Sequence, residues 1–230
     1  NHIAGITTRS DIRAGVLSVD VKTARTGSDR VCVTLSADGK TLAERSSMAG
    51  QPVHLAVEHP RLWSPDDPYL YDLTVTLVRD GRVIDRAESY AALREIATGR
   101  DANGIERMTL NGRPLFHFGP LDQGWWPDGL YTAPTDEALL YDIRFTKQLG
   151  FNMIRKHIKV EPERWYWHCD REGILVWQDM PSGDMSTGKW EPHRYGAGTD
   201  AARSEESLAN YYKEWGEIMD FCGRHPSVVV

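Results

Sequence analysis

The 230-residue sequence is poor in cysteine and in long apolar runs. Its three cysteines, Cys32, Cys169 and Cys222, are odd in number and lie in apolar periodic segments. We therefore expect small core residues rather than disulfides or a zinc site. No window approaches the roughly 18 consecutive apolar residues of a membrane-spanning helix, and the chain does not open on a basic and apolar leader. These absences predict a soluble protein and leave its compartment open, periplasmic and secreted locations included.

An excess of basic charge is also lacking. The 27 Lys and Arg side chains are outnumbered by 33 Asp and Glu, which gives a formal net charge of −6, and no basic cluster occurs. We therefore expect no nucleic-acid partner and no membrane partner, and a neutral or weakly charged ligand fits better. The sequence contains no Gly-x-Ser-x-Gly elbow and no His-Glu-x-x-His motif, and it indicates no metal and no cofactor.

The segment from residue 12 to residue 98 has the pattern of a β-sandwich. Short runs of alternating, β-branched residues indicate strands, and these runs occur at 16–21, 31–35, 53–57 and 71–78. The dipeptides Asp38-Gly39 and Asp80-Gly81 lie between runs and favour the positive φ of tight hairpin turns. Short strands separated in this way predict an antiparallel sandwich of the immunoglobulin-like size class.

The remainder of the chain has helix signals. Thr135 is expected to cap a helix that Gly150 ends, and Pro162 and Gly173 bracket a second helix. Ser204 opens a third helix, after a polar loop from 182 to 203. Apolar residues recur along this third helix at the spacing of a buried stripe, namely Leu208, Tyr211, Tyr212, Trp215, Ile218, Met219 and Cys222.

Strand signals alternate with these helices and begin near residues 115, 151, 174 and 227. This alternation is typical of parallel βαβ units, in either a doubly wound sheet or a (β/α)8 barrel. A complete barrel needs eight strands and roughly 250 residues. The pattern therefore predicts half a barrel at most, with residues 227–230 as the start of a buried strand.

Chemistry at such a sheet gathers at the carboxyl ends of the strands. Trp125 and Trp126 follow the first predicted strand in a turn-rich loop. Indole faces stack on the apolar faces of sugar rings, so we expect at least one of them to contact carbohydrate. The alternative is that one or both cover the sheet as ordinary core aromatics. Seven of the eight tryptophans follow Gly99, which favours a ligand in this half.

Arg155 and His157 end the second strand, where alternation directs both to the same side. Arg can orient a carboxylate, and His can bond a hydroxyl group. Asp179 ends the third strand and can bind a sugar hydroxyl, cap a turn or pair with Arg155. Substrate binding and an Arg155–Asp179 brace are both open for these residues, and the brace is the simpler role for Asp179.

Several stretches resemble family 2 glycoside hydrolases, a group that includes β-galactosidases, β-glucuronidases and β-mannosidases. They read LNGRPLF at 110–116, KQLGFNMIR at 147–155 and CDREGILVWQD at 169–179, like the barrel entry of that family. Residues 62–71 and 90–94 resemble the end of the immunoglobulin-like domain before the barrel. The stretches after the first two strands, 119–126 and 156–159, depart from the galactosidase and glucuronidase patterns, whereas Trp177-Gln178-Asp179 resembles the mannosidase branch.

The resemblance implies a multi-domain chain, an all-β immunoglobulin-like sandwich followed by a partial (β/α)8 TIM barrel. Residues 1–11 would be the trace of an N-terminal jelly-roll sugar-binding domain, 12–98 the sandwich, and 99–230 the N-terminal half of the catalytic barrel. The family retains anomeric configuration with two Glu residues. In the family pattern residues 225–230 lead into the acid/base Asn-Glu pair, so we expect the chain to end before it and to be inactive alone.

Two functional hypotheses follow. In the first, the parent protein is a retaining β-glycosidase for β-galactosides, β-glucuronides or β-mannosides, and this chain lines its sugar pocket. The residues assigned to that pocket are Asp122, Trp125, Trp126, Arg155, His157 and Asp179. In the second, the chain belongs to a non-catalytic carbohydrate-binding or scaffold module. Carbohydrate is the expected partner in both, and a homo-oligomer of the full-length protein is left open.

Overall fold

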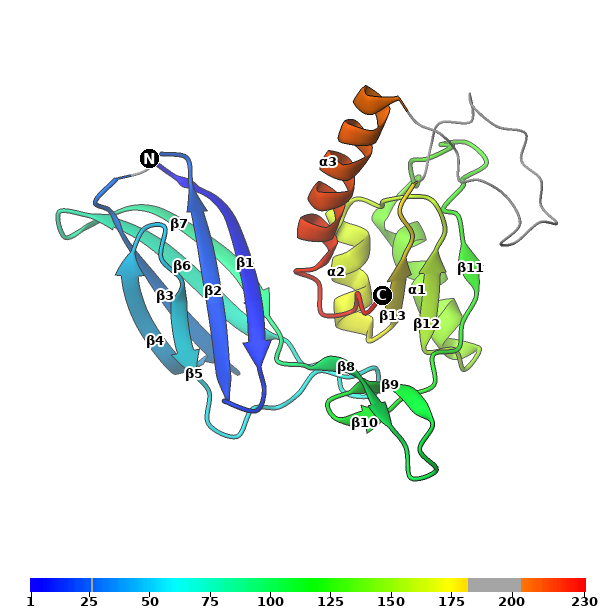
Figure 1. Cartoon of the computed structure of the whole chain (residues 1–230). Coiled ribbons are helices and arrows are strands. Elements are labelled where there is room, and N and C mark those ends of the chain that lie inside the picture. The colour runs from blue at the N-terminus through cyan, green and yellow to red at the C-terminus, as the bar shows by residue number, and fades with distance from the viewer. Residues whose placement is uncertain (26, 182–203) are drawn as a thin grey trace.

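A computed structural model describes residues 1–25, 27–181 and 204–230. The chain forms two halves side by side, a β-sandwich and a mixed α/β half, joined at one end by a small sheet (Figure 1). The loop predicted at 182–203 lies outside the described residues. Within the described part of the chain, no helix combines the length and apolar character needed to cross a bilayer.

The sandwich contains seven strands in two sheets. One sheet has the order β1-β2-β5, and the strands are Ile3–Asp11, Val16–Thr23 and Val53–Ala56. The other has the order β4-β3-β6-β7, and the strands are Lys40–Met48, Arg30–Ala37, Tyr71–Arg79 and Arg82–Ala91. All neighbouring strands are antiparallel. The predicted strands and the sandwich are confirmed.

Alternation builds the sandwich core. In β3 the side chains of Val31, Val33 and Leu35 are buried, whereas their neighbours along the strand are more exposed. The turn residues Asp38-Gly39 join β3 to β4 and have φ values of 50° and 74°. Two consecutive positive φ values are the requirement of a type I′ turn, whose twist matches that of the strands. The hairpin turn that the Asp38-Gly39 dipeptide predicts is therefore confirmed.

The first strand differs from the sequence prediction. The resemblance predicts that residues 1–11 are the trace of a preceding jelly roll, whereas in the structure Ile3–Asp11 forms β1 and pairs with β2. Ile3 and Ile6 pack against the sandwich core. Residues 3–11 mix small and polar side chains without regular apolar alternation. The sequence of this edge strand therefore lacks the pattern that predicts a strand.

A small antiparallel sheet connects the halves, with the order β10-β9-β8. Its strands are Ile96–Arg100, Glu106–Leu110 and Arg113–Pro114. Asn111-Gly112 forms the turn between the last two with φ values of 53° and 75°. In Figure 1 this sheet lies below the α/β half and beside the lower end of the sandwich, and the chain passes from it into the α/β half.

The α/β half contains a parallel sheet in the order β11-β12-β13. Its elements in chain order are β11 Leu121–Asp122, α1 Asp136–Gln148, β12 Met153–Lys156, α2 Glu163–Glu172, β13 Leu175–Gln178 and α3 Glu205–Cys222. The predicted caps are confirmed at Thr135, which accepts from the amide of Ala138, and at Gly173, with φ 71°. Ser204 likewise accepts from the amide of Ser207.

The last residues continue this sheet. Val176 donates to the carbonyl of Ser227, Val229 donates to that of Val176, and Gln178 donates to that of Val230. Val228 thus forms a parallel bridge with Val176. The parallel strand predicted at 227–230 is present as this short pairing beside β13.

Two sequence predictions in this half are wrong. The first strand was placed near residue 115, but the structure forms β11 at Leu121–Asp122, and Phe116 and Phe118 are 79 % and 55 % exposed. The stripe of α3 was expected to be buried, but Leu208, Tyr212, Trp215 and Met219 are exposed, and among its seven residues only Cys222 is fully buried. The reason is that α3 contacts the core through its C-terminal turns, with Ile218, Phe221 and Cys222 in the cluster.

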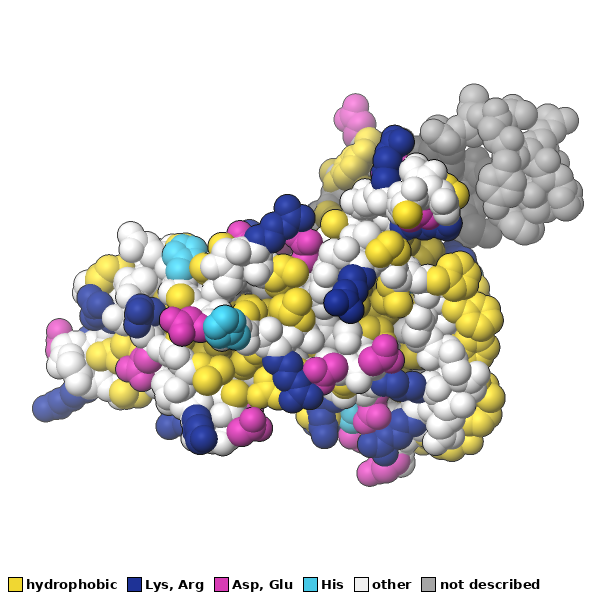
Figure 2. Space-filling view, turned by 90° about the horizontal axis from the view of Figure 1, so that it is seen from below, with side chains coloured by type: hydrophobic (Ala, Val, Ile, Leu, Met, Phe, Trp, Pro, Cys, Tyr) yellow, Lys and Arg dark blue, Asp and Glu magenta, His cyan; other side chains and the backbone are white. Residues whose placement is uncertain are grey.

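Other apolar side chains of the α/β half are also exposed. Figure 2 shows them gathered along the border of this half that lies away from the sandwich. The exposed apolar residues of α1 are Tyr141 and Phe145, and Leu149 follows at its C-cap. Periodicity alone identified helical faces correctly but could not determine which of them are covered.

Asp170 of α2 holds the two halves together. Its carboxylate is fully buried and accepts from the hydroxyl of Tyr90 in β7 at 2.6 Å, from Nδ1 of His225 at 2.8 Å and from the amide of Ser227 at 2.9 Å. Its carbonyl accepts from Nε1 of Trp63 at 2.8 Å. One residue thereby connects the sandwich, α2 and the segment that extends the parallel sheet.

Candidate functional site

The carboxyl ends of β11, β12 and β13 meet at one edge of the parallel sheet. Leu121 pairs with Arg155, and Asp122 pairs with Lys156, which in turn pairs with Gln178. The side chains at these strand ends alternate between the two faces of the sheet. The predicted residues are therefore divided between two environments.

Arg155 and Asp179 form a bidentate ion pair. The guanidinium donates from Nε to Oδ1 at 3.0 Å and from an Nη atom to Oδ2 at 2.9 Å. The Asp179 carboxylate raises the pKa of Arg155 through these hydrogen bonds. The Arg155 side chain is 45 % exposed, so solvent screens the pair and its contribution to stability is small. The Arg155–Asp179 ion pair, one of the two roles that the sequence left open, is therefore formed. The Asp179 carboxylate in this pair remains partly exposed at the edge of the sheet.

His157 lies next to this pair in the chain and is half-buried. Its Nδ1 accepts from the amide nitrogen of Gln123 at 2.9 Å. Because Nδ1 is an acceptor in this bond, the proton of the neutral ring is placed on Nε2. His157 can thus donate a hydrogen bond from Nε2, which suits a hydroxyl group.

Trp177 of β13 shares the face of Arg155, with which it is in register. Its Nε1 donates to Nδ1 of His117 at 2.9 Å, and burial lowers the pKa of His117. The neutral form of His117 therefore accepts the indole proton over a wider pH range. His117 and Gln123 are not among the predicted site residues: His117 lies within the apolar run that predicts the first strand, and Gln123 lies in the loop after it.

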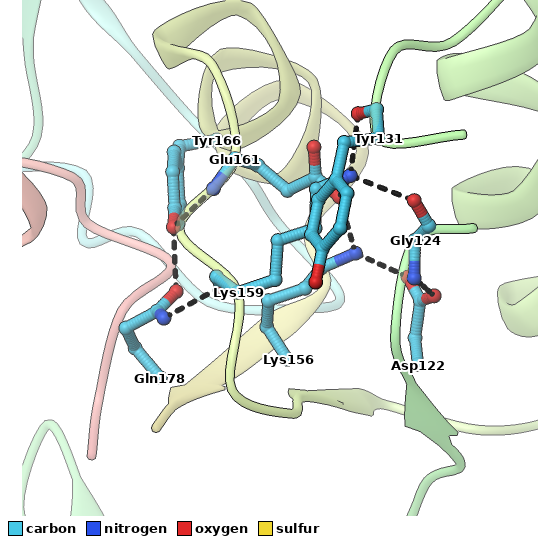
Figure 3. Close-up of polar contacts among 8 residues, drawn as sticks. All are labelled: Asp122, Gly124, Tyr131, Lys156, Lys159, Glu161, Tyr166 and Gln178. Atoms are coloured by element: carbon cyan, nitrogen blue, oxygen red, sulfur yellow. Dashed lines mark hydrogen bonds and ion pairs between the residues drawn. The ribbon is translucent and has the colours of Figure 1, made fainter. Parts of the chain in front are cut away.

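Asp122 points into a second environment, a buried network of charges (Figure 3). Its Oδ2 accepts from Nζ of Lys156 at 2.5 Å, and its Oδ1 accepts from the amide of Gly124 at 2.7 Å. Lys156 is 1 % exposed and also donates to Oε1 of Glu161 at 2.9 Å. Its Nζ lies 4.3 Å from the centre of the Trp165 ring, a cation–π contact. Asp122 therefore supports the loop that follows it.

The same network reaches β13 through Tyr166 and Gln178 (Figure 3). The hydroxyl of Tyr166 donates to Oε1 of Gln178 at 2.5 Å, and Nε2 of Gln178 donates to the carbonyls of Lys159 and Asp179 at 2.9 Å each. Burial raises the pKa of Tyr166, so its hydroxyl stays protonated and continues to donate. The backbone at Asp179 is thereby fixed from behind the sheet.

The two tryptophans of the first loop have different surroundings. Trp126 packs against the core cluster that contains Trp165 and Ile154, and its buried Nε1 has no hydrogen-bond partner among the described residues. Trp125 is 55 % exposed, and its ring centroid lies 4.3 Å from that of Tyr131. Trp126 thus fits the covering role that the sequence left open, whereas Trp125 is available to a ligand.

The structure brings Arg155, Asp179 and His157 to the exposed edge and directs Asp122 into the buried network. The structure adds four residues that the sequence did not predict as part of the site, namely Lys156, Lys159, Glu161 and Tyr131. Within the described part of the chain, no three His, Cys, Asp or Glu side chains gather as a metal-binding group would.

Comparisons with known proteins relate the chain to a family of glycosidases. Residues 1–94 match the family model described as glycosyl hydrolases family 2. The β-galactosidase of Lactococcus lactis subsp. lactis (strain IL1403) is 30 % identical over 128 residues, which are 55 % of this chain and 12 % of that protein. A putative β-glucuronidase of Formosa agariphila is 31 % identical over 179 residues, 74 % of this chain and 16 % of that protein. The chain therefore spans less than a fifth of the length of these curated relatives.

Solved structures share the fold. The β-D-glucuronidase of Dictyoglomus thermophilum superposes with a TM-score of 0.80 at 19 % identity. The superposition covers 99 % of this chain and 37 % of the glucuronidase chain. The β-glucuronidase of Ruminococcus gnavus in complex with D-glucuronic acid gives a TM-score of 0.79 at 20 % identity, covering 99 % of this chain and 36 % of its own. The resemblance that the motifs indicated is confirmed: residues 1–94 match glycosyl hydrolases family 2, and the relatives found along the chain are named as a β-galactosidase and a putative β-glucuronidase.

Proposed function

We propose that the whole protein is a retaining β-glycosidase that hydrolyses β-galactosides, β-glucuronides or β-mannosides. The observation that carries the proposal is the cluster of Arg155, His157 and Asp179 at the carboxyl edge of a parallel sheet, in a chain whose residues 1–94 match glycosyl hydrolases family 2. Sugar hydroxyls need fixed donors and acceptors, and the apolar face of the ring needs an aromatic surface. Trp125 offers such a surface on the neighbouring loop.

We infer that β11, β12, β13 and residues 227–230 are the first strands of a (β/α)8 barrel, and that residues 99–230 form its N-terminal half. The support is that the strands are parallel and are neighbours in chain order, with α1 and α2 as the crossovers. In a barrel the substrate lies at the carboxyl ends of the strands. The exposed edge described above is then one wall of the sugar pocket.

Each residue of that wall has a distinct role in the proposal. Asp179 accepts a hydrogen bond from a sugar hydroxyl while Arg155 fixes its orientation, and His157 donates from Nε2 to a second hydroxyl. Trp125 stacks on the ring, whereas Trp126 and Asp122 support the loop from within.

We further propose that the 230-residue chain binds sugar without hydrolysing it. A retaining glycosidase needs two carboxyl groups about 5–5.5 Å apart, one acting as acid/base and the other as nucleophile. Asp179 is paired with Arg155 and Asp122 with Lys156, so neither matches that requirement. The two catalytic Glu residues of the family are therefore expected elsewhere in the whole protein.

The test is a calorimetric titration of the chain with methyl β-D-galactopyranoside, methyl β-D-mannopyranoside and methyl β-D-glucuronide. We expect saturable binding of at least one glycoside and its loss in Trp125→Ala. Trp215→Ala removes a tryptophan that is 40 % exposed on α3, and this control variant should bind as the unsubstituted chain does. Equal effects of the two substitutions, or no binding to any of the three, would contradict the proposal.

Hydrolysis is tested on the full-length protein with the 4-nitrophenyl β-glycosides of the same three sugars. We expect turnover of one of them with retention of configuration, followed by NMR of the released anomer. A full-length protein that binds sugar without turnover would instead be the non-catalytic module.

A further inference from the structure

The loop at 124–131 carries an exposed aromatic pair, here called the platform, which consists of Trp125 and Tyr131. The two side chains are 55 % and 49 % exposed. Their rings are 4.3 Å apart between centroids and inclined at 56°. Rings as exposed as these bury little apolar surface, so packing against the core stabilises their orientation only weakly. The backbone that carries them therefore has a larger share in orienting them.

Lys159 holds both ends of this loop (Figure 3). Its Nζ donates to the carbonyl of Gly124 at 2.7 Å and to that of Tyr131 at 2.8 Å. It also pairs with Oε1 of Glu161 at 3.0 Å. The ammonium group is thus held by two hydrogen bonds and one ion pair. Lys159 and Glu161 are 6 % and 4 % exposed, so the contacts form out of water, where they are strong.

The loop is also closed on itself and attached to the core. Trp126 and Leu130 exchange two backbone hydrogen bonds at 2.8 and 3.0 Å, and the side chain of Trp126 packs into the core cluster. Trp125 precedes Trp126 and is exposed. The backbone at Trp125 is thus restrained by Trp126 on one side and by the Lys159 contact at Gly124 on the other, which restrains where the Trp125 side chain leaves the loop.

Gly124 allows the backbone to approach Lys159 closely. Its φ is +63°, and a Cβ at this position would lie 2.2 Å from Oε1 of Glu161 and 2.8 Å from Nζ of Lys159. Both distances are below any van der Waals contact, and the positive φ is itself unfavourable for a residue with a side chain. The close approach therefore requires glycine.

We propose that Lys159, held by Glu161, is a positioning residue that sets the orientation of the platform, on which the apolar face of a pyranose ring stacks. The inference rests on the proposed function for the sugar and on the contacts above for the positioning. Because Lys159 is buried and its ammonium group is held by two carbonyls and by Glu161, it acts through Trp125 and Tyr131 rather than on the sugar itself. It is thus a determinant of affinity that lies outside the Arg155–Asp179 edge.

Lys159→Met tests this, because Met keeps much of the side-chain volume and removes the three donors. The chain is labelled with 5-fluorotryptophan, and the Trp125 signal in the 19F spectrum is assigned by its absence in Trp125→Phe. We expect the Trp125 signal to shift or broaden in Lys159→Met. For a glycoside that the unsubstituted chain binds, we expect an affinity about fivefold or more weaker, the size of one stacking contact.

Lys147→Met is the matched control. Lys147 also donates to two main-chain carbonyls, those of Pro65 and Glu172, but at the junction with the sandwich. We expect this variant to lose stability while its Trp125 signal and its glycoside affinity stay unchanged. If Lys159→Met does not fold, Gly124→Ala replaces it, since the added Cβ displaces Glu161 and Lys159 from the loop side.

The outcomes separate the two proposals. An unchanged Trp125 signal in both Lys159→Met and Gly124→Ala overturns the positioning role, whatever the glycosides do. A changed signal with unchanged affinity overturns the stacking of the sugar on the platform. If the unsubstituted chain binds none of the three methyl glycosides, the proposed function fails, and the 19F signal alone still decides whether Lys159 positions the platform.

Discussion

The two halves of the molecule bury different chemistry. Among the described residues of the sandwich, the fully buried side chains are apolar apart from Asp29. In the α/β half Lys156, Lys159, Glu161 and Asp170 are all at most 6 % exposed. Apolar alternation is sufficient to form a sheet, whereas buried charges cost desolvation and are stable only with well-placed partners. Buried charge thus occurs mainly where the chain positions a loop or an interface, and among the described residues of the sandwich Asp29 is the exception.

The largest expected effect is that of removing the buried carboxylate between the halves. Asp170→Ala leaves the hydroxyl of Tyr90, Nδ1 of His225 and the amide of Ser227 without their acceptor. We expect a loss of about 4 kcal/mol in the free energy of unfolding, measured by urea denaturation. Asp72→Ala, at an exposed position of β6, should change it by less than about 0.5 kcal/mol. A loss at Asp170 as small as at Asp72 would remove the contrast between the halves.

A core substitution tests the sandwich in the same measurement. Leu73 is 1 % exposed in the core cluster, and Leu73→Ala is expected to cost about 3 kcal/mol through lost burial and the remaining cavity. The loss should not vary with pH, because no charged partner is involved. Leu42→Ala, at a residue 48 % exposed, is the control. Similar losses at both positions would contradict an apolar core as the source of sandwich stability.

A smaller effect isolates one contact between the halves. Tyr90→Phe removes the hydroxyl that donates to Asp170 at 2.6 Å. Burial raises the pKa of Tyr90, so the hydroxyl is a donor at all ordinary pH values. We expect a loss of about 2 kcal/mol, as for a buried hydrogen bond to a charged group. Tyr141→Phe, at a residue 63 % exposed, should be neutral in thermal unfolding. An equal loss in the two variants would mean that Tyr90 contributes only its ring.

The smallest effect is the pH dependence of Asp29, the charged exception of the sandwich. The hydrogen bond from Arg79 lowers the pKa of Asp29 from 3.8 to about 2, with help from Asn1. A carboxyl whose pKa is lowered in the folded state stabilises it above the unfolded value, and this contribution disappears as the pH falls through the folded value.

Asp29→Asn should therefore melt at a lower temperature than the unsubstituted chain at neutral pH. The difference in melting temperature should narrow as the pH falls from about 4 to about 2. Asp20→Asn, at a residue of β2 that is not fully buried, provides the comparison. A difference that is constant with pH would show that the Asp29 charge does not contribute to stability.

The sandwich was predictable because its signals are local. Alternation over five to nine residues determines which side chains of β3 and β6 face inward, and Asp-Gly determines the hairpin turns between strands. Helix caps such as Thr135 are equally local. The wrong predictions concern which apolar side chains are covered by segments that are distant in the sequence. The run from 114 to 118 is apolar but leaves Phe116 exposed, and the stripe of α3 is exposed beyond its last turns. A single periodic pattern does not specify its packing partner.

The candidate site was predictable only in part. Arg155, His157 and Asp179 follow apolar strands, so the topology brings them together. Lys156 and Lys159 could not be recognised, since a lysine in sequence is normally exposed unless it is paired. Glu161 is close to both lysines in the chain, but their other partners, Asp122, Gly124 and Tyr131, lie at least 28 residues away. Contacts at such separation depend on the completed fold.

The central claim is that the carboxyl edge of the parallel sheet, and not the sandwich, binds a sugar. The most direct measurement is a 1H–15N titration of the labelled chain with methyl β-D-galactopyranoside, methyl β-D-mannopyranoside and methyl β-D-glucuronide. For one of them, we predict saturable shifts of the amides of Gln123, Trp125 and His157, with the amides of Val33 and Val75 in the sandwich unchanged. Shifts confined to the sandwich, or none with any of the three, would contradict the account.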